Sequence, residues 1–195
     1  MDARLYPRRW MRIPGGWAAD NTTNSRRLWK PPVSRQRPPA TIMVFDTEFT
    51  YLNHRLKEIG WLLVSSNKII TRRRLCVQGW CMQQFALRQF KTDLRKASAV
   101  CGHSVEQDIE VVTRELGYSP FSGKAVVCTA KLAMKRGYTC APKLVTLHRN
   151  VTGEEFTQRH DALEDAEACY RCLRAAVAAS WGGLPKVVRR ALGAG

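Results

Sequence analysis

The sequence predicts an α/β domain in which helices flank a mixed five-stranded sheet. Two observations lead to this prediction. Three strand-like segments come first, and only a short turn at 65–68 separates the second from the third. Short apolar segments then alternate with helix-like segments, which is typical of parallel strands joined by helices. A meander followed by such alternation places antiparallel and parallel neighbours in one sheet.

The first strand is predicted at 42–49, where the chain reads IMVFDTEF. Its four apolar residues are partly β-branched, follow two prolines and end abruptly at Asp46. A short apolar run bounded in this way is typical of a buried strand. Apolar or β-branched segments predict the other strands at 56–64, 69–77, 99–102 and 125–128.

Helices are predicted from apolar residues at helical spacing and from the residues that end them. Segment 82–96 has apolar side chains at positions 82, 85, 86, 90 and 94, with basic residues between them. Segment 105–116 is followed by Gly117, a common residue just after a helix end. The alanine-rich segment 160–179 is the longest. Shorter helices are expected at 130–135 and 143–148.

The 195 residues suit one domain with two flanking segments. We place the domain at 41–181 and a short basic C-terminal tail at 182–195. Residues 1–40 hold nine Lys or Arg, six of the nine prolines and three of the six tryptophans, with no visible period. We therefore expect a disordered basic arm. The arm is compatible with nucleic-acid binding, with a nuclear signal or with an organelle signal.

Composition points to a polyanionic partner. The formal charge is +16, and nucleic acid is the commonest partner of such a chain. No apolar run approaches the roughly 20 residues of a membrane span, so we expect no membrane partner. Seven scattered cysteines, an odd number, favour free thiols in a reducing intracellular compartment.

Asp46 and Glu48 form the first candidate site. Side chains two positions apart on a strand point to the same side of the sheet. Two carboxylates held this close repel each other unless a cation lies between them. Mg²⁺ and Mn²⁺ prefer such oxygen ligands. The alternative is a strand end in which one acid caps a turn.

Two further segments carry candidate acids. GHSVEQD at 102–108 follows the fourth predicted strand and places Asp108 in the first turns of a helix. HDALED at 160–165 begins the longest helix, with His160 at its N-terminus and Asp165 within the helix. Taken alone, Asp108 is explained by the helix dipole and His160 by capping or solvation.

Together, FDTEFT, GHSVEQD and HDALEDA resemble, in this order, the three motifs of the DEDDh exonucleases, which belong to the ribonuclease H-like superfamily. The resemblance covers roughly 41–178, and EIG at 58–60 supports it. It implies 3′→5′ hydrolysis of single-stranded nucleic acid, DNA or RNA, to nucleoside monophosphates. It also implies two divalent metal ions, Mg²⁺ or Mn²⁺, held by Asp46, Glu48, Asp108 and Asp165. His160 would be the general base.

The chain departs from the family at two places, since Phe49 stands where many members have threonine and Cys128 where many have aspartate. The resemblance places Thr47 and Phe49 near the terminal nucleotide, where Phe49 could stack on a base; the alternative for Phe49 is a core aromatic.

The arginines at 72–74 are expected on a solvated edge of the sheet. The acids around the candidate site are expected on the surface, namely Glu106, Glu110, Asp161, Glu164 and Glu167.

Two rival functions stay open at this point. One is a non-catalytic nucleic-acid-binding module on a nuclease fold, although the complete set of five polar residues argues against it. The other gives the main role to the basic arm, which would tether the protein to a partner. A homodimer, a polymerase or another protein partner is equally compatible with the resemblance.

Overall fold

A computed structural model describes residues 39–50, 52–53 and 55–194. Five strands form one mixed sheet in the order β3-β2-β1-β4-β5. β1 is antiparallel to β2 and parallel to β4, β2 is antiparallel to β3, and β4 is parallel to β5. The predicted fold class is therefore confirmed. The strands are β1 Thr41–Phe49, β2 Leu56–Ser65, β3 Lys68–Cys76, β4 Ala99–Gly102 and β5 Ala125–Cys128.

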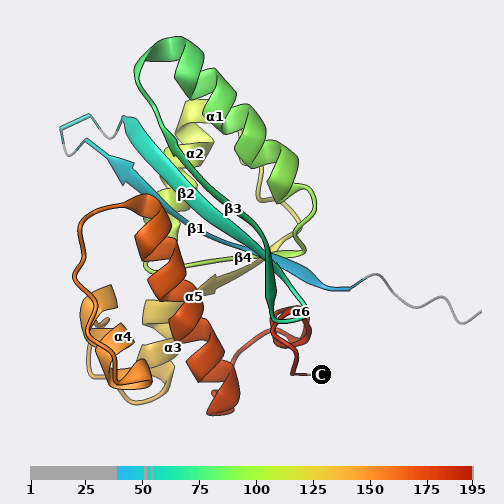
Figure 1. Ribbon diagram of the computed structural model, residues 1–195, viewed down its shortest axis with the longest axis vertical. Coiled ribbons are helices and arrows are strands. Elements are labelled where there is room, and N and C mark those ends of the chain that lie inside the picture. Colours follow the sequence, from blue (N-terminus) through green and yellow to red (C-terminus); the bar gives the residue numbers. More distant parts are fainter. Residues whose placement is uncertain (1–38, 51, 54, 195) are drawn as a thin grey trace, which may run out of the picture. The chain divides into compact units, whose positions relative to one another are not determined.

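Helices cover both faces of this sheet (Figure 1). α1 and α2 pack on one face, while α5 packs across β1 and β2 on the other face, with α3, α4 and α6 beside it. The helices are α1 Gly79–Leu94, α2 Glu106–Leu116, α3 Thr129–Lys135, α4 Leu144–Thr152, α5 Ala162–Ala178 and α6 Lys186–Ala191.

The alternation of side chains along β1 and β2 produces two hydrophobic cores. Val44 and Leu62 face α5 and are fully buried there with Leu173. On the other face, Trp61 meets Phe90 of α1 edge-on, with ring centroids 5.5 Å apart. Because both faces of the sheet are covered, β2 is buried along almost its whole length, which explains its nearly continuous apolar sequence.

The predicted element boundaries hold to within a few residues, with two differences. α4 extends beyond the expected 143–148 and ends at Gly153, whose φ of 75° suits glycine. The segment expected as a short basic tail instead forms α6. Its Val188 and Ala191 are fully buried in the α5-side core. Short helices of this kind have too few residues to show a clear period.

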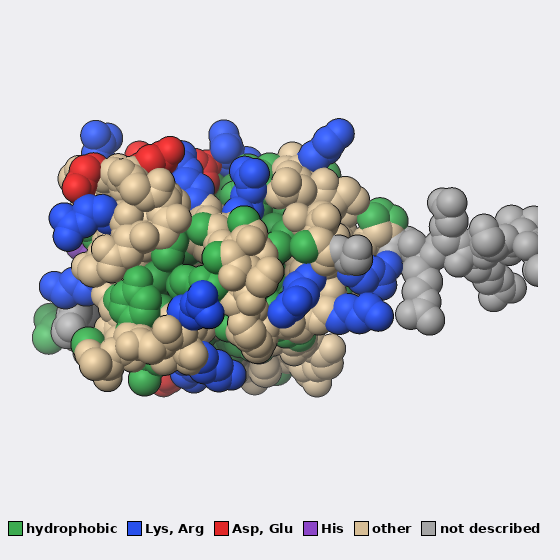
Figure 2. Space-filling view, turned by 90° about the horizontal axis from the view of Figure 1, so that it is seen from below, with side chains coloured by type: hydrophobic (Ala, Val, Ile, Leu, Met, Phe, Trp, Pro, Cys, Tyr) green, Lys and Arg blue, Asp and Glu red, His purple; other side chains and the backbone are tan. Residues whose placement is uncertain are grey.

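Basic side chains are spread over the side of the domain built from α3, α4, α6 and the end of α5. Figure 2 shows this side, where Lys and Arg are scattered and Asp and Glu gather at one edge. The expected basic arm, 1–40, lies outside the described residues except for its last two. All seven cysteines are free. Among the helices that the structure describes, none is long and apolar enough to cross a membrane.

Candidate active site

The C-terminal end of β1 carries the first two candidate acids on the face covered by α5. Asp46 lies opposite Gly60 of β2, and Glu48 lies opposite Glu58. The pairing register shifts immediately after Glu48. An irregularity at a strand end is a common way to aim a side chain next to a site. Asp46 and Glu48 are thus presented together, as their spacing predicts.

Asp108 reaches the same strand end from the opposite face. It lies in the first turn of α2 and is buried. Its Oδ1 accepts two hydrogen bonds from Thr47, one from the backbone N–H at 3.0 Å and one from the hydroxyl at 2.6 Å. Thr47, which points away from Asp46 and Glu48, therefore fixes where the Asp108 carboxylate lies.

The start of α5 supplies the other two residues. His160 precedes the helix by two positions, and its φ of 56° is a strained, left-handed backbone conformation. Its ring is exposed, and Nδ1 lies 3.6 Å from Oε1 of Glu48. Asp165 lies one turn into α5 and is buried. Glu48, His160 and Asp165 each offer one ligand atom within 4.8 Å of the others.

Neighbouring residues hold this helix start against the sheet. Asp161 is the N-cap of α5, and its carboxylate accepts the backbone N–H groups of Leu163 and Glu164. Arg74 of β3 contacts Asp161 at 2.6 Å and Glu58 at 3.0 Å. Asp161 and Arg74 therefore have a structural task, which corrects the expectation that both are solvated surface groups.

Glu58 and Gly60 explain why the EIG segment is needed at this place. Oε1 of Glu58 accepts the backbone N–H of Ala162, the first residue of α5, at 2.9 Å. A Cβ on Gly60 would lie 2.3 Å from the backbone nitrogen of Leu163. Only glycine at position 60 lets the start of α5 come this close to β2, at the point where β2 pairs with Asp46.

The carboxylates of the site are arranged unfavourably for a protein without a bound cation. Burial raises the pKa of Asp46 well above its usual value, and the charges of Asp108, Asp165 and Glu48 raise it further. Burial likewise raises the pKa of Glu48 and of Asp165, against the opposing effect of the His160 ring.

One carboxylate oxygen of the site lacks a hydrogen-bond partner within the part of the chain that the structure describes. Gln158 donates to Oδ2 of Asp165 at 2.7 Å, whereas Oδ1 is buried and accepts no hydrogen bond from the described residues. An unpaired buried carboxylate oxygen among other acids is unfavourable without a cation. A hard divalent ion such as Mg²⁺ or Mn²⁺ would relieve both problems, because it prefers oxygen ligands. The residues present therefore fit such an ion.

Asp108 should make the metal-free protein less stable as the pH rises toward neutrality. Burial raises the pKa of Asp108 to about 7, although the two Thr47 hydrogen bonds lower it. The folded state then binds a proton that the unfolded state releases near 3.8, so stability falls as pH rises between these values. In EDTA, Asp108 should contribute a loss on the order of 2 kcal/mol between pH 5 and pH 7.

Urea unfolding of wild type and Asp108→Asn, followed across this pH range, measures that contribution as the difference between the two curves. Asparagine keeps the oxygen that accepts from Thr47 and removes only the titration. We expect the wild-type loss to disappear with Mn²⁺ present. Parallel curves for the two proteins in EDTA would contradict the prediction.

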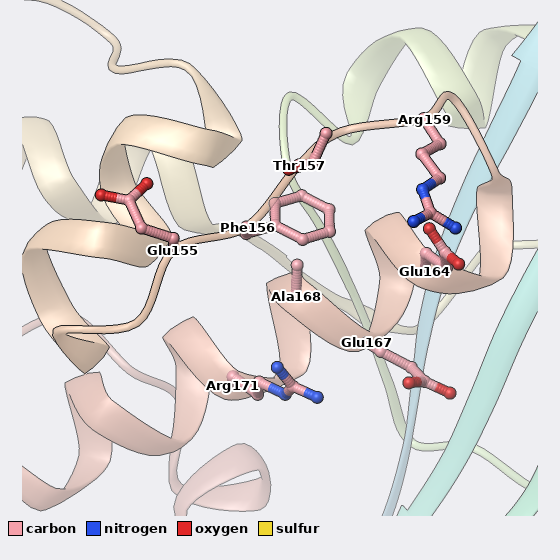
Figure 3. Close-up of a pocket in the computed structure, with 8 residues that line it drawn as sticks. All are labelled: Glu155, Phe156, Thr157, Arg159, Glu164, Glu167, Ala168 and Arg171. Atoms are coloured by element: carbon pink, nitrogen blue, oxygen red, sulfur yellow. The ribbon is translucent and has the colours of Figure 1, made fainter.

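A mixed-charge hollow of about 360 Å³ lies beside the site (Figure 3). The segment that leads to His160 forms one wall, and α5 forms the other. Arg159 points toward Glu164 at its upper end, and none of the five candidate residues lines it. Arg159 therefore belongs to the wall of this hollow.

The two residues expected near the terminal nucleotide differ in their surroundings. Thr47 is buried and occupied with Asp108. Phe49 is half-buried and packs against the core between the sheet and α1–α2. Contact of either with a nucleotide stays a prediction.

Among the supporting residues, only Asp161 could have been identified from the sequence, since an aspartate before an alanine-rich helix is a common N-cap. Arg74 and Gln158 could not, because nothing in the local sequence indicates their partners.

No protein-family model and no curated protein matches this sequence. Among solved structures, the chain is similar to Exonuclease X in complex with 5′ overhanging duplex DNA, with a TM-score of 0.53 and 17% identity over 78% of this chain and 99% of that one. It is also similar to the Neurospora crassa Pan2 catalytic unit, a protease and nuclease domain, with a TM-score of 0.49 and 18% identity over 73% of this chain. The chain spans only 28% of that unit. At 17% identity, the likeness to Exonuclease X shows the fold alone.

Proposed function

We propose that this chain is a metal-dependent 3′→5′ exonuclease of the DEDDh type, which hydrolyses single-stranded DNA or RNA to nucleoside monophosphates. The observation that carries the proposal is the buried carboxylate of Asp165, which offers a ligand atom within 4.8 Å of those of Glu48 and His160 and whose Oδ1 accepts no hydrogen bond from the described residues. The fold shared with Exonuclease X supports it, since that protein is solved with DNA bound. The basic composition fits the same substrate class.

The proposed reaction needs a nucleophile, a proton acceptor and relief of negative charge. Asp46, Glu48, Asp108 and Asp165 would hold two divalent ions, which acidify water and relieve charge on the oxygens around phosphorus. Four carboxylates nearly neutralise two such ions. The site is then left without a large net charge that would repel a phosphodiester.

The remaining residues either transfer a proton or hold the carboxylates in position. The exposed ring of His160 takes the proton from the attacking water, whose oxygen forms a bond to phosphorus while the bond from phosphorus to the O3′ of the preceding nucleotide breaks. That O3′ takes up a proton and becomes the new 3′ end, and the terminal nucleotide leaves as a 5′-monophosphate. Gln158 and Thr47 hold the carboxylates of Asp165 and Asp108 in place.

His160→Asn should lower kcat by about 10²- to 10⁴-fold, the usual contribution of a general base. Asparagine tolerates the left-handed backbone that His160 adopts, so the variant removes the ring without adding strain. Steady-state hydrolysis of a 5′-labelled oligonucleotide measures the effect. Mn²⁺ affinity by calorimetry should change far less than kcat.

The decisive experiment is digestion of 5′-labelled single-stranded DNA and RNA with Mg²⁺ or Mn²⁺, with EDTA as the control. A ladder that shortens from the 3′ end and disappears with EDTA supports the proposal and shows which sugar is preferred. Intact oligonucleotides in every metal, with binding retained, would instead favour a non-catalytic binding module.

A further inference from the structure

A hollow of about 640 Å³ runs along α1 on the side of the sheet away from α5. Trp80, at the start of α1, lines one end of it, and Arg95, just after the helix, lines the other. Leu116, the last residue of α2, also lines it. We call this hollow the α1 groove. The 15 positions from Trp80 to Arg95 correspond to about 22 Å along a helix axis.

The α1 groove is strongly basic. Arg88, Lys91 and Arg95 line it at spacings of three and four residues, which places them along one side of the helix. Arg88 and Arg95 are exposed. Within the described part of the chain, none of the three forms an ion pair. Their charges are therefore available to an anionic ligand.

The acid of α1 and the acid at the end of α2 both have partners of their own. Asp93 is buried and accepts hydrogen bonds from Trp61, Arg73 and Lys96. Glu115 accepts from the side chain of Gln83 and from the backbone N–H of Leu56. Neither carboxylate lines the α1 groove. The groove consequently keeps its positive charge.

Exposed aromatic rings lie among the cations. Trp80 is 73% exposed, although tryptophan is usually largely buried. Tyr118 is 52% exposed, and Nζ of Lys91 lies 5.5 Å from the centre of its ring. Rings next to cations are what single-stranded nucleic acids require, because bases stack on the rings while phosphates contact the cations.

The α1 groove continues toward the candidate active site. A second hollow of about 230 Å³ shares Trp80 with it, is lined by Arg55 and by the hydrogen-bonded Glu115, and reaches Leu56 at the start of β2. Leu56 pairs with Phe49, which directly follows Glu48. A strand that lies in the groove would thus approach the end of β1 that bears the acids.

We propose that the α1 groove binds the sugar–phosphate backbone of a single-stranded polynucleotide, upstream of the end held at the acidic site. This inference rests on the proposed function for the direction of the strand, but its binding test does not. At about 3.4 Å per stacked nucleotide, the groove spans about six nucleotides. The preferred substrate is then a polynucleotide rather than a dinucleotide or trinucleotide.

Fluorescence anisotropy with 5′-fluorescein oligo(dT) and oligo(U) of 20 nucleotides tests the groove. All proteins carry Asp46→Asn to prevent cleavage, and all keep the full chain, so the basic arm contributes equally. The triple variant Arg88→Ala, Lys91→Ala, Arg95→Ala should raise Kd by about tenfold or more and reduce the salt slope of log K by about 2. Trp80→Ala should raise Kd by roughly fivefold or more with little change of salt slope, and Trp80→Phe should restore part of the loss.

The matched control is Lys135→Ala, Arg136→Ala, Arg174→Ala, which removes the same charge from exposed positions on the α3 and α5 side. We expect it to change Kd by less than about threefold, because distant exposed charges are screened. Equal losses in both triple variants would overturn the proposal in favour of a general charge effect. Unchanged binding in the groove triple would overturn it as well and leave an acidic protein as the partner to examine.

Hydrolysis provides the second comparison. With Asp46 intact, the groove triple should lower the ratio of kcat/KM for the 20-mer to kcat/KM for a trinucleotide by about tenfold. An unchanged ratio would contradict the proposal. If no protein cleaves either substrate in any metal, the proposed function fails, while the anisotropy comparison still decides whether the groove binds nucleic acid.

Discussion

Asp46→Asn is expected to reduce kcat/KM for a 5′-labelled oligonucleotide by at least about 10³-fold. A metal ion that stabilises charge in the transition state contributes several kcal/mol, and each 1.4 kcal/mol corresponds to a factor of ten in rate. Asparagine has nearly the same shape but carries no charge, so it is a poor ligand for a hard divalent ion. A gel assay with Mn²⁺ measures the loss.

The same substitution should stabilise the metal-free protein. Burial and four neighbouring acids disfavour the ionised form of Asp46, which is why its pKa is raised. Removing the charge should raise the free energy of unfolding in EDTA by on the order of 1 kcal/mol. Added Mn²⁺ should stabilise wild type more than the variant.

Glu110→Gln is the matched control for Asp46→Asn. Glu110 is an exposed acid on α2, two positions after Asp108, and the substitution removes one carboxylate charge without touching the site. We expect wild-type activity and unchanged stability for this control. An Asp46→Asn protein that keeps wild-type activity, or is less stable than wild type in EDTA, would show that this strand end does not hold a metal.

Gly60→Ala is expected to have the largest effect on folding. The added Cβ would lie 2.3 Å from the nitrogen of Leu163 and 2.6 Å from the carbonyl oxygen of Ala162. Both are backbone atoms, so no side chain can rotate away, and the start of α5 has to shift. We expect a loss of about 3 kcal/mol, at the upper end of overpacking costs, and a fall in Tm of roughly 6–12 °C.

The matched control for this position is Gly182→Ala. No atom lies within 4 Å of the Cβ that it would add, and this glycine has no positive φ. Its stability should stay within about 0.5 kcal/mol of wild type. Thermal unfolding by circular dichroism compares the two variants. A Gly60→Ala protein as stable as Gly182→Ala would mean that α5 does not approach β2 as closely as described.

Activity separates the positioning role of Gly60 from its effect on folding. Because His160 and Asp165 lie on either side of the contact between Gly60 and α5, a displaced helix start should lower kcat at temperatures where the variant is fully folded. If folded Gly60→Ala cleaves oligonucleotides at the wild-type rate, the helix start has shifted without moving these two residues.

Much of the fold follows from local sequence. The apolar run before Asp46, the strand pattern of 56–64 and the glycine after Leu116 are local signals, and each corresponds to an element of the structure. The spacing of Asp46 and Glu48 similarly determined that both side chains project together, because side chains alternate along any strand. The sequence did not predict α6, because its few apolar residues show no period and are buried only by packing into the α5-side core.

The sequence by itself determined the strand that carries the first two acids and the helix that carries Asp165. Only the tertiary structure decided what holds them in place. Arg74 joins Glu58 to Asp161, Thr47 holds Asp108, and Gly60 admits the helix start. The partners in these contacts are 16 to 103 positions apart in sequence. Local sequence patterns do not predict these long-range contacts, because the contacts form only when the strands and helices have packed.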